Sequence, residues 1–232
     1  MWNGKMKAVT FSYDDGVLQD KRLIKLFDKY GLKGTFNLNS GTIGRAGSLF
    51  RNNGTVAHCK FSRDEIRSVY AGHEIAAHTV DHPFLKDIED DAEIIRQVEE
   101  DRLVLSEIAG YEVRGMAYPM GSQYVDERVF DLVRNHTGIR YARTTTSTHS
   151  FDLQDDLIAF NPTEYHLENW DGLMEKAKEL IEMTPDRPQL FYVWGHAYEF
   201  DAWDDWDKME EFCRLISGHA DIFYGTNSEV LL

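Results

Sequence analysis

Five acidic and imidazole side chains occur at spacings that suit shared chemistry. They are Asp14 and its neighbour Asp15, the pair His78 and His82 four residues apart, and His196 near the other end of the chain. Two adjacent carboxylates repel each other unless a cation or a proton lies between them. Two imidazoles and one carboxylate form a three-ligand metal site with open positions, as in catalytic zinc and non-haem ferrous iron centres. These residues therefore predict metal chemistry if the fold brings them together.

The residues that do not bind the metal fit acid–base catalysis. With Asp15 as the carboxylate ligand, Asp14 lies beside the cation and could take a proton from an attacking water molecule. His196 could then protonate the leaving group. Together these roles describe metal-assisted hydrolysis of an acyl bond.

Each feature also has a purely structural interpretation. Asp-Asp-Gly, at Asp14 to Gly16, is a common turn sequence. With nine histidines in 232 residues, chance alone supplies roughly a third of a pair at the spacing of His78 and His82. The chemical interpretation is favoured because these polar clusters follow β-forming runs. We expect one helical turn after the strand to aim both imidazoles at one point.

Strand-like and helix-like patterns alternate about seven times along the chain. Strands are expected at 8–13, 33–38, 74–77, 115–118, 139–142, 157–160, 189–194 and 222–224, and helices at 17–30, 62–71, 84–109, 124–135, 168–183 and around 209–216. This alternation predicts a single α/β domain over 1–232, a barrel with its active site at the C-terminal strand ends. An open doubly wound sheet is the alternative, but no phosphate-binding glycine motif follows the first strand. Residues 39–60 are expected to form a long functional loop.

Charge and cysteine content limit the partners. Forty acidic against twenty-five basic residues give a net charge of −15, which argues against nucleic acid or an anionic membrane surface and favours neutral or cationic substrates. No stretch approaches the ~18 apolar residues of a membrane span. Cys59 and Cys213 are expected to be free thiols, and the first residues show no leader pattern, so we expect a cytoplasmic location. The oligomeric state is not predicted.

Two motifs resemble the polysaccharide deacetylases of the NodB-homology type, carbohydrate esterase family four. Ser12 to Gly16 is similar to the first motif, Thr-Phe-Asp-Asp-Gly, whose first aspartate is the base and whose second binds the metal. Residues 78–83 match the second motif, His-Ser/Thr-x-x-His-Pro, at every fixed position. The segments 34–36 and 72–75 are also typical. The resemblance implies a distorted (β/α)7-type barrel of about seven units, zinc as the usual metal, and removal of N-acetyl groups from sugars.

The match weakens in the second half of the chain. The third motif, Arg-x-Pro-Tyr-Gly, corresponds to residues 117–121, where Ala117 replaces the arginine that orients the base. Arg143, at the next strand end, is our candidate substitute, and Arg114 is a weaker one. The motif's tyrosine position, whose backbone N–H helps form the oxyanion hole, falls on Met120, and a backbone donor tolerates any side chain but proline.

The last motifs are only partly present. Trp194-Gly195-His196 represents the fifth motif without its aspartate partner, and the fourth motif is not found. Glu199, Asp201 or His149 could orient His196. Aromatic residues around this strand end could stack on a sugar or pack in the core: Tyr192, Trp194, Tyr198, Trp203 and Trp206.

The chain is therefore predicted to be a metal-dependent hydrolase, with carbohydrate N-deacetylation of a small molecule or an oligosaccharide as the leading activity and Zn²⁺ as the leading metal. Removal of an O-acetyl group stays open. Hydrolysis of a cyclic imide, ureide or formamide by the same superfamily is favoured by the missing motifs. A ferrous-iron oxygenase and a non-catalytic sugar-binding protein are the remaining alternatives.

Overall fold

Strand β1 (Lys7–Asp14) is the centre of the main sheet in the computed structural model, which describes residues 1–232. It is buried along its whole length. It pairs in parallel with β9 (Gln189–Gly195), with β2 (Gly34–Leu38) along its C-terminal half and with β10 (Ile222–Tyr224) along its N-terminal half. A strand flanked by partners and covered on both faces explains the continuous apolar run in its sequence.

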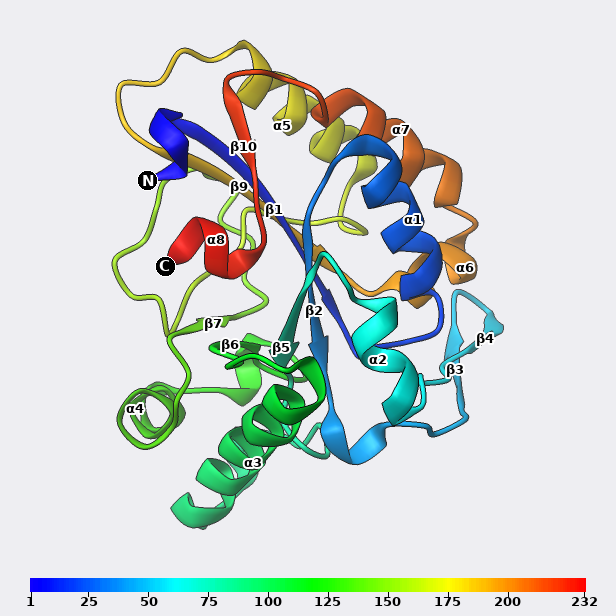
Figure 1. Cartoon of the computed structure of the whole chain (residues 1–232), viewed down its shortest axis with the longest axis vertical. Coiled ribbons are helices and arrows are strands. Elements are labelled where there is room, and N and C mark those ends of the chain that lie inside the picture. Colours follow the sequence, from blue (N-terminus) through cyan, green and yellow to red (C-terminus); the bar gives the residue numbers. More distant parts are fainter.

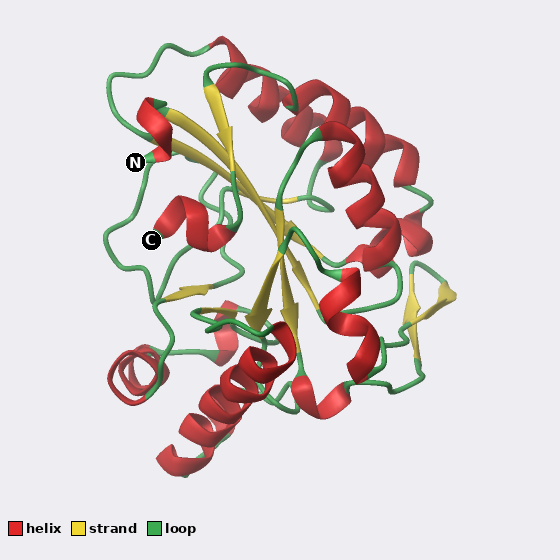
Figure 2. Cartoon of the chain, viewed as in Figure 1, coloured by secondary structure: helices red, strands yellow, loops and turns green.

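The eight-stranded sheet has the order β7–β6–β5–β2–β1–β9–β8, with β10 beside β1. The remaining strands are β5 (Glu74–Ala77), β6 (Gly115–Ala117), β7 (Tyr141–Arg143) and β8 (Glu164–Tyr165). The sheet curls into a half-barrel with helices outside it (Figure 2). Phe160 N donates to Ala142 O at 3.0 Å and Thr163 N to Tyr192 O at 2.9 Å, so residues 157–163 connect β7 with β9. The predicted parallel α/β barrel-type fold is confirmed.

Helices surround this sheet (Figure 1). They are α1 (Asp20–Tyr30), α2 (Arg63–Val69), α3 (Asp91–Ala109), α4 (Glu127–His136), α5 (Trp170–Glu182), α6 (Ala197–Trp203), α7 (Trp206–Ile216) and α8 (Asn227–Leu231), with short 3-10 turns at Trp2–Gly4, Ser40–Thr42, Leu85–Asp87 and Ser122–Tyr124. Their apolar faces pack on the strands, as Phe27 of α1 does on Phe11 of β1, with ring centroids 4.6 Å apart. None of the helices is long and apolar enough to cross a membrane.

Several predicted boundaries were wrong for local reasons. The helix expected over 84–109 begins at Asp91, because the Asp90 carboxylate caps it by accepting a hydrogen bond from Ala92 N at 2.9 Å. The strand expected at 157–160 forms only an isolated bridge, and β8 follows it. Helices α6 and α8 were not predicted, since both are short.

Residues 39–60 contain a β-hairpin where a loop was expected. Strands β3 (Ser48–Arg51) and β4 (Gly54–Ala57) pair with each other and with no strand of the main sheet. The hairpin stands apart from the sheet beside α6 (Figure 1), and Asn52 Nδ2 donates to Ala202 O of that helix at 3.0 Å. Its turn residues Asn52 and Asn53 both have positive φ, as two-residue hairpin turns require.

Candidate active site

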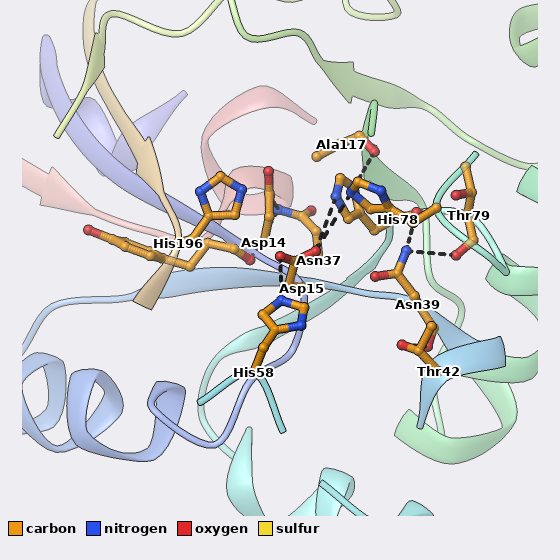
Figure 3. A network of polar contacts seen from close by, with 12 residues as sticks. Asp14, Asp15, Asn37, Asn39, Thr42, His58, His78, Thr79, Ala117 and His196 are labelled. Atoms are coloured by element: carbon orange, nitrogen blue, oxygen red, sulfur yellow. Dashed lines mark hydrogen bonds and ion pairs between the residues drawn. The ribbon is translucent and has the colours of Figure 1, made fainter. Parts of the chain in front are cut away.

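The two aspartates lie at the C-terminal end of β1. β1 ends at Asp14, and the chain then turns through Asp15 and Gly16, whose φ angles are 80° and 62°. Figure 3 shows the two carboxylates with His78 on one side and His196 on the other. The fold therefore brings together residues that are up to 182 positions apart, and it does so at the strand ends where they were expected.

Asp14 is a buried carboxylate held by two donors. Asn37, its register partner on β2, donates Nδ2 to Asp14 Oδ1 at 2.8 Å, and the Arg143 guanidinium donates to Oδ2. Burial acts to raise the pKa of Asp14, but Arg143, His78 and His196 together lower it below its ordinary value. Asp14 is therefore ionised at neutral pH and can accept a proton.

Arg143 occupies the place proposed for a substitute arginine. It is fully buried, and its guanidinium lies 4.4 Å from the centre of the Trp194 ring. Its register partner on β6 is Ala117, the position where the third motif has its arginine. Arg114, the weaker candidate, forms a surface ion pair with a neighbouring glutamate instead. The cation beside Asp14 thus comes from β7, the neighbour of the strand β6 that carries the motif position.

Asp15, His78 and His82 offer ligand atoms that all lie within 4.8 Å of one another. Asp15 Oδ1 is 3.9 Å from His78 Nε2 and 3.7 Å from His82 Nε2. His78 Nδ1 donates to Ala117 O at 2.8 Å, which leaves the Nε2 lone pair free. Burial lowers the pKa of His78 to about 4 and lowers that of His82 as well, so both imidazoles are neutral, as ligands must be. This donor set fits a divalent metal such as zinc.

The segment that carries the two histidines is not the helical turn that was expected. Thr79 and His82 have φ angles of 68° and 58°, in the left-handed region that is strained for a β-branched residue. Asp101 Oδ2 accepts a hydrogen bond from His78 N at 2.8 Å, and Asn39 Nδ2 donates to Thr79 O at 3.0 Å. These side chains hold the strained backbone, and the two imidazole centroids lie 4.8 Å apart.

His196 faces the aspartates from the end of β9. Its Nδ1 lies 3.1 Å from Glu199 Oε1, and its backbone N donates to Glu199 Oε2 at 3.0 Å. Burial acts to lower the pKa of His196, but Glu199, Asp15 and Asp14 raise it to about 9. The imidazole is therefore protonated at neutral pH and can donate a proton from Nε2.

Glu199 is the only one of the three proposed partners that contacts His196. Asp201 accepts hydrogen bonds from Trp206 Nε1 at 2.7 Å and from a glutamine, and His149 pairs with Glu164 at 3.1 Å. Glu199 also accepts the Tyr165 hydroxyl and lies 3.3 Å from His166 Nε2. The contact between Glu199 and His196 follows from their His-x-x-Glu spacing, which forms a capping box at the start of α6.

Four further polar residues of the site were missed in the sequence. Asn37 is the next-to-last residue of β2, so a search for polar residues near strand ends could have found it. His58 Nε2 lies 3.0 Å from Asp15 Oδ2, and Lys60 donates to the Asp15 main-chain oxygen. Burial acts to raise the pKa of Asp15, but His58 and Lys60 help to lower it well below its ordinary value. His166 is buried against Glu199 and had no motif to mark it.

Met120 lies at the rim of the site in a left-handed conformation, with φ of 69°. The residue is 43% exposed. Its backbone N–H donates to no acceptor within the protein, whereas the next amide, of Gly121, donates to Pro119 O at 2.9 Å. The Met120 amide is therefore available to a bound molecule, as the oxyanion role requires.

A pocket of about 820 Å³ opens above these residues. It is lined by both aspartates, both ligand histidines, His196 and Met120, by the hairpin arms, and by aromatic side chains, namely Tyr118, Tyr165, Trp194 and Tyr198. Of the five aromatic residues considered for sugar stacking, only Trp194 and Tyr198 line this pocket. Its volume is typical of small-ligand sites.

A model of the polysaccharide deacetylase family matches residues 3–142, more than half of the sequence. The chain belongs to the polysaccharide deacetylase family. The resemblance of its first two motifs is thereby confirmed. Arg143, His196 and Glu199 lie beyond the matched residues, so their assignment depends on the geometry described above. No curated protein sequence matches the chain.

Solved structures share the fold of this chain at low sequence identity. A family 4 carbohydrate esterase from Streptomyces lividans is 10% identical, with a TM-score of 0.58 over 96% of this chain and 92% of its own. A polysaccharide deacetylase from Bacillus cereus is 15% identical, with a TM-score of 0.59 over 97% and 94%. A family pseudoenzyme from Bacillus anthracis is 14% identical, with a TM-score of 0.58 over 97% and 66%. Because the fold is shared with a pseudoenzyme, activity has to be argued from the site.

Proposed function

We propose that this chain is a metal-dependent hydrolase that removes an N-acetyl group from a carbohydrate. The observation that carries the proposal is that Asp14, ion-paired to Arg143, and His196, ion-paired to Glu199, lie beside one metal-type donor set. A base and an acid in opposite protonation states at the same pH are what hydrolysis of an amide needs.

Asp15, His78 and His82 would hold the metal, for which we propose Zn²⁺. A divalent metal there would polarise the acyl carbonyl and lower the pKa of the attacking water. His58 contacts the Asp15 oxygen that is farther from the two imidazoles, so it orients this carboxylate rather than completing the set.

Asp14 accepts a proton from the attacking water molecule as the water oxygen bonds to the acyl carbon. Arg143 and Asn37 keep the carboxylate ionised and fix its orientation, because each contacts a different oxygen. Asp14 is too buried for its charge to be maintained by solvent. Arg143 is therefore a positioning residue that acts through Asp14.

His196 delivers a proton to the departing amine nitrogen as the carbon–nitrogen bond breaks. Glu199 holds Nδ1, so Nε2 is the atom that donates. The Met120 N–H donates to the negative charge that develops on the carbonyl oxygen. Acetate and the free amino sugar are the products.

Two observations favour catalysis over sugar binding alone. The proposed base and acid are both present, and each is held by a buried partner that favours its charged state, Arg143 for Asp14 and Glu199 for His196. Burying such charges costs free energy of desolvation, and ionisable groups held in this way cluster at functional sites.

The test is release of acetate. Zinc-loaded protein would be incubated with acetylated chitin and peptidoglycan fragments, with O-acetylated xylan, and with cyclic imides and ureides. Acetate from an N-acetyl sugar supports the proposal, and its loss in Asp14→Asn identifies the base. Acid released only from imides or ureides would assign the alternative C–N hydrolysis, and turnover by Asp14→Asn at the wild-type rate would show that the base is wrong.

A further inference from the structure

One face of the β3–β4 hairpin and its stem forms a wall of the pocket. Side chains of an extended strand point alternately to opposite faces. Most of the lining residues follow this alternation, and only Ala46 departs from it. They are Arg45, Gly47, Leu49 and Arg51 on the first arm, and His58 and Lys60 on the second. The stem is paired, since Lys60 N donates to Arg45 O at 2.9 Å and His58 N to Gly47 O at 2.8 Å. Phe50, on the opposite face, is 70% exposed.

This wall is cationic although the whole chain is strongly acidic. Arg45 and Arg51 form no ion pair with any acidic residue, whereas most arginines of the chain do, such as Arg63 with Glu107 at 3.1 Å. The acidic residues of the pocket are already engaged by Arg143, His58 and His196. The positive charge of the two hairpin arginines is therefore not neutralised from within the protein.

The hairpin has anchors other than the two arginines. The anchors are main-chain and amide groups: Leu18 N donates to Cys59 O, Gln19 Nε2 to Ala57 O, both at 2.9 Å, and Asn52 Nδ2 to Ala202 O. The Arg51 side chain donates to the neighbouring carbonyl of Phe50 and also lies beside the Tyr198 hydroxyl in the pocket. Guanidinium groups that line a pocket and have no acidic partner in the protein can bind a ligand.

We propose that Arg45 and Arg51 bind an oxyanion, a phosphate or carboxylate, on the acylated sugar that enters this pocket. This inference rests on the proposed function and adds its substrate class. Guanidinium groups bind both oxyanions through paired N–H donors. Leu49, between the arginines, offers an apolar contact to the carbons of the sugar. The net charge of the chain favoured a neutral or cationic substrate, but the local charge of the pocket wall decides recognition.

The test measures binding rather than turnover. Zinc-loaded full-length protein would be titrated calorimetrically with N-acetylglucosamine, N-acetylglucosamine 6-phosphate and N-acetylmuramic acid, which are neutral, phosphorylated and carboxylated. We expect at least one charged sugar to bind about tenfold or more tighter than the neutral one at low salt, and its identity distinguishes phosphate from carboxylate. The double variant Arg45→Gln/Arg51→Gln should lose this preference and keep its affinity for the neutral sugar.

Arg67→Gln is the matched control, because Arg67 is exposed, lies on α2 and forms no ion pair. Equal affinity for neutral and charged sugars in the wild type would overturn the inference, and so would an unchanged preference in the double variant. Failure of the proposed function is separable: a charge preference without acetate release from any sugar removes the activity and keeps the binding site. Acetate release from neutral sugars without a preference for charged ones would support the activity and remove the proposed binding site.

Discussion

Ala117 and Arg143 are register partners on the neighbouring parallel strands β6 and β7. Side chains at paired positions of parallel strands point to the same face of the sheet. The Arg143 guanidinium therefore enters the site at the level where an arginine at position 117 would, and it reaches Asp14 from there. The proposed base thus keeps an ion pair with an arginine, although this arginine comes from the next strand.

Arg143→Ala should lower kcat by about 10²-fold or more, because Asp14 loses the cation that keeps it ionised and oriented. Ala117→Arg/Arg143→Ala should regain part of that loss. Initial rates of acetate release measure both, with Arg140→Ala, an exposed neighbour, as the control. Wild-type turnover in Arg143→Ala would contradict the positioning role.

The same substitution should also destabilise the fold. Removing one partner of a buried pair costs about 3–5 kcal/mol, so chemical denaturation should accompany the kinetics. Arg143→Lys keeps a positive charge and can be measured instead if Arg143→Ala does not fold. A lysine variant with normal stability and reduced kcat would separate orientation from stability.

The pH profile should depend on Glu199. His196 must be protonated to act as the acid, so kcat/KM should fall as pH rises through its pKa of about 9. Glu199→Gln removes the carboxylate that raises this pKa, and the alkaline limb should move down by about one pH unit or more, toward the ordinary value of about 6.5. Glu168→Gln, at the surface, is the control. An alkaline limb that stays in place in Glu199→Gln would exclude His196 as its source.

Zinc binding should require the Asp15, His78 and His82 set. We expect one zinc per chain by calorimetry, and zinc at 100 times its dissociation constant should raise the free energy of unfolding by about 2.7 kcal/mol. His82→Ala should lose this stabilisation, and His149→Ala, whose exposed imidazole pairs outside the site, should keep it. Equal stabilisation of both variants would place the metal elsewhere.

The role of Met120 lies in its backbone. Met120→Gly keeps the N–H and suits a φ of 69°, so kcat should stay within about threefold of the wild type. Met120→Pro removes the donor and cannot adopt a φ of 69°, so it should cost about 10²-fold or more in kcat even where circular dichroism shows an intact fold. A strong loss in Met120→Gly would assign the role to the side chain.

Asp20 should make stability depend on pH. It is fully buried, accepts the Tyr70 hydroxyl at 2.7 Å, and has its second oxygen unpaired. Burial raises its pKa to about 8, above an unfolded value of about 3.9. The folded state therefore holds a proton that the unfolded state releases, and stability should fall as pH rises from about 4 to about 8.

Asp20→Asn does not titrate and should avoid this loss. Its advantage over the wild type in urea denaturation should grow across that pH range and exceed about 1.4 kcal/mol, the equivalent of one pKa unit. Asp64→Asn, at an exposed position of α2 without an ion pair, is the control. A difference between Asp20→Asn and wild type that does not change with pH would show that Asp20 is ionised throughout.

The strand-end residues could be predicted because their signals are local. Runs of β-forming residues end in Asp14, His78 and His196, and parallel strands bring their C-terminal ends to one edge. Arg143 was identifiable for the same reason, since it follows the next such run. Asn37 obeyed this rule too, and only the absence of a charge made it inconspicuous.

Residues that depend on tertiary contacts could not be predicted. The hairpin has few apolar side chains, and anchors on α6 and on the residues after β1 hold it, so its sequence resembles a loop and His58 went unnoticed. The left-handed φ angles of Thr79 and His82 are stabilised by Asp101 and Asn39, which are distant in sequence, so a helical turn was expected in their place.

The separation of the hairpin from the main sheet makes this protein suited to changes of specificity. Its tip carries Arg51 and shares no hydrogen-bonded strand with the barrel that holds Asp14 and His196. We therefore expect substitutions between residues 48 and 55 to alter which molecules enter while the groups proposed to transfer protons keep their positions. In a library of variants, selectivity and turnover should vary independently at these positions, which makes them the place to begin directed evolution of new substrates.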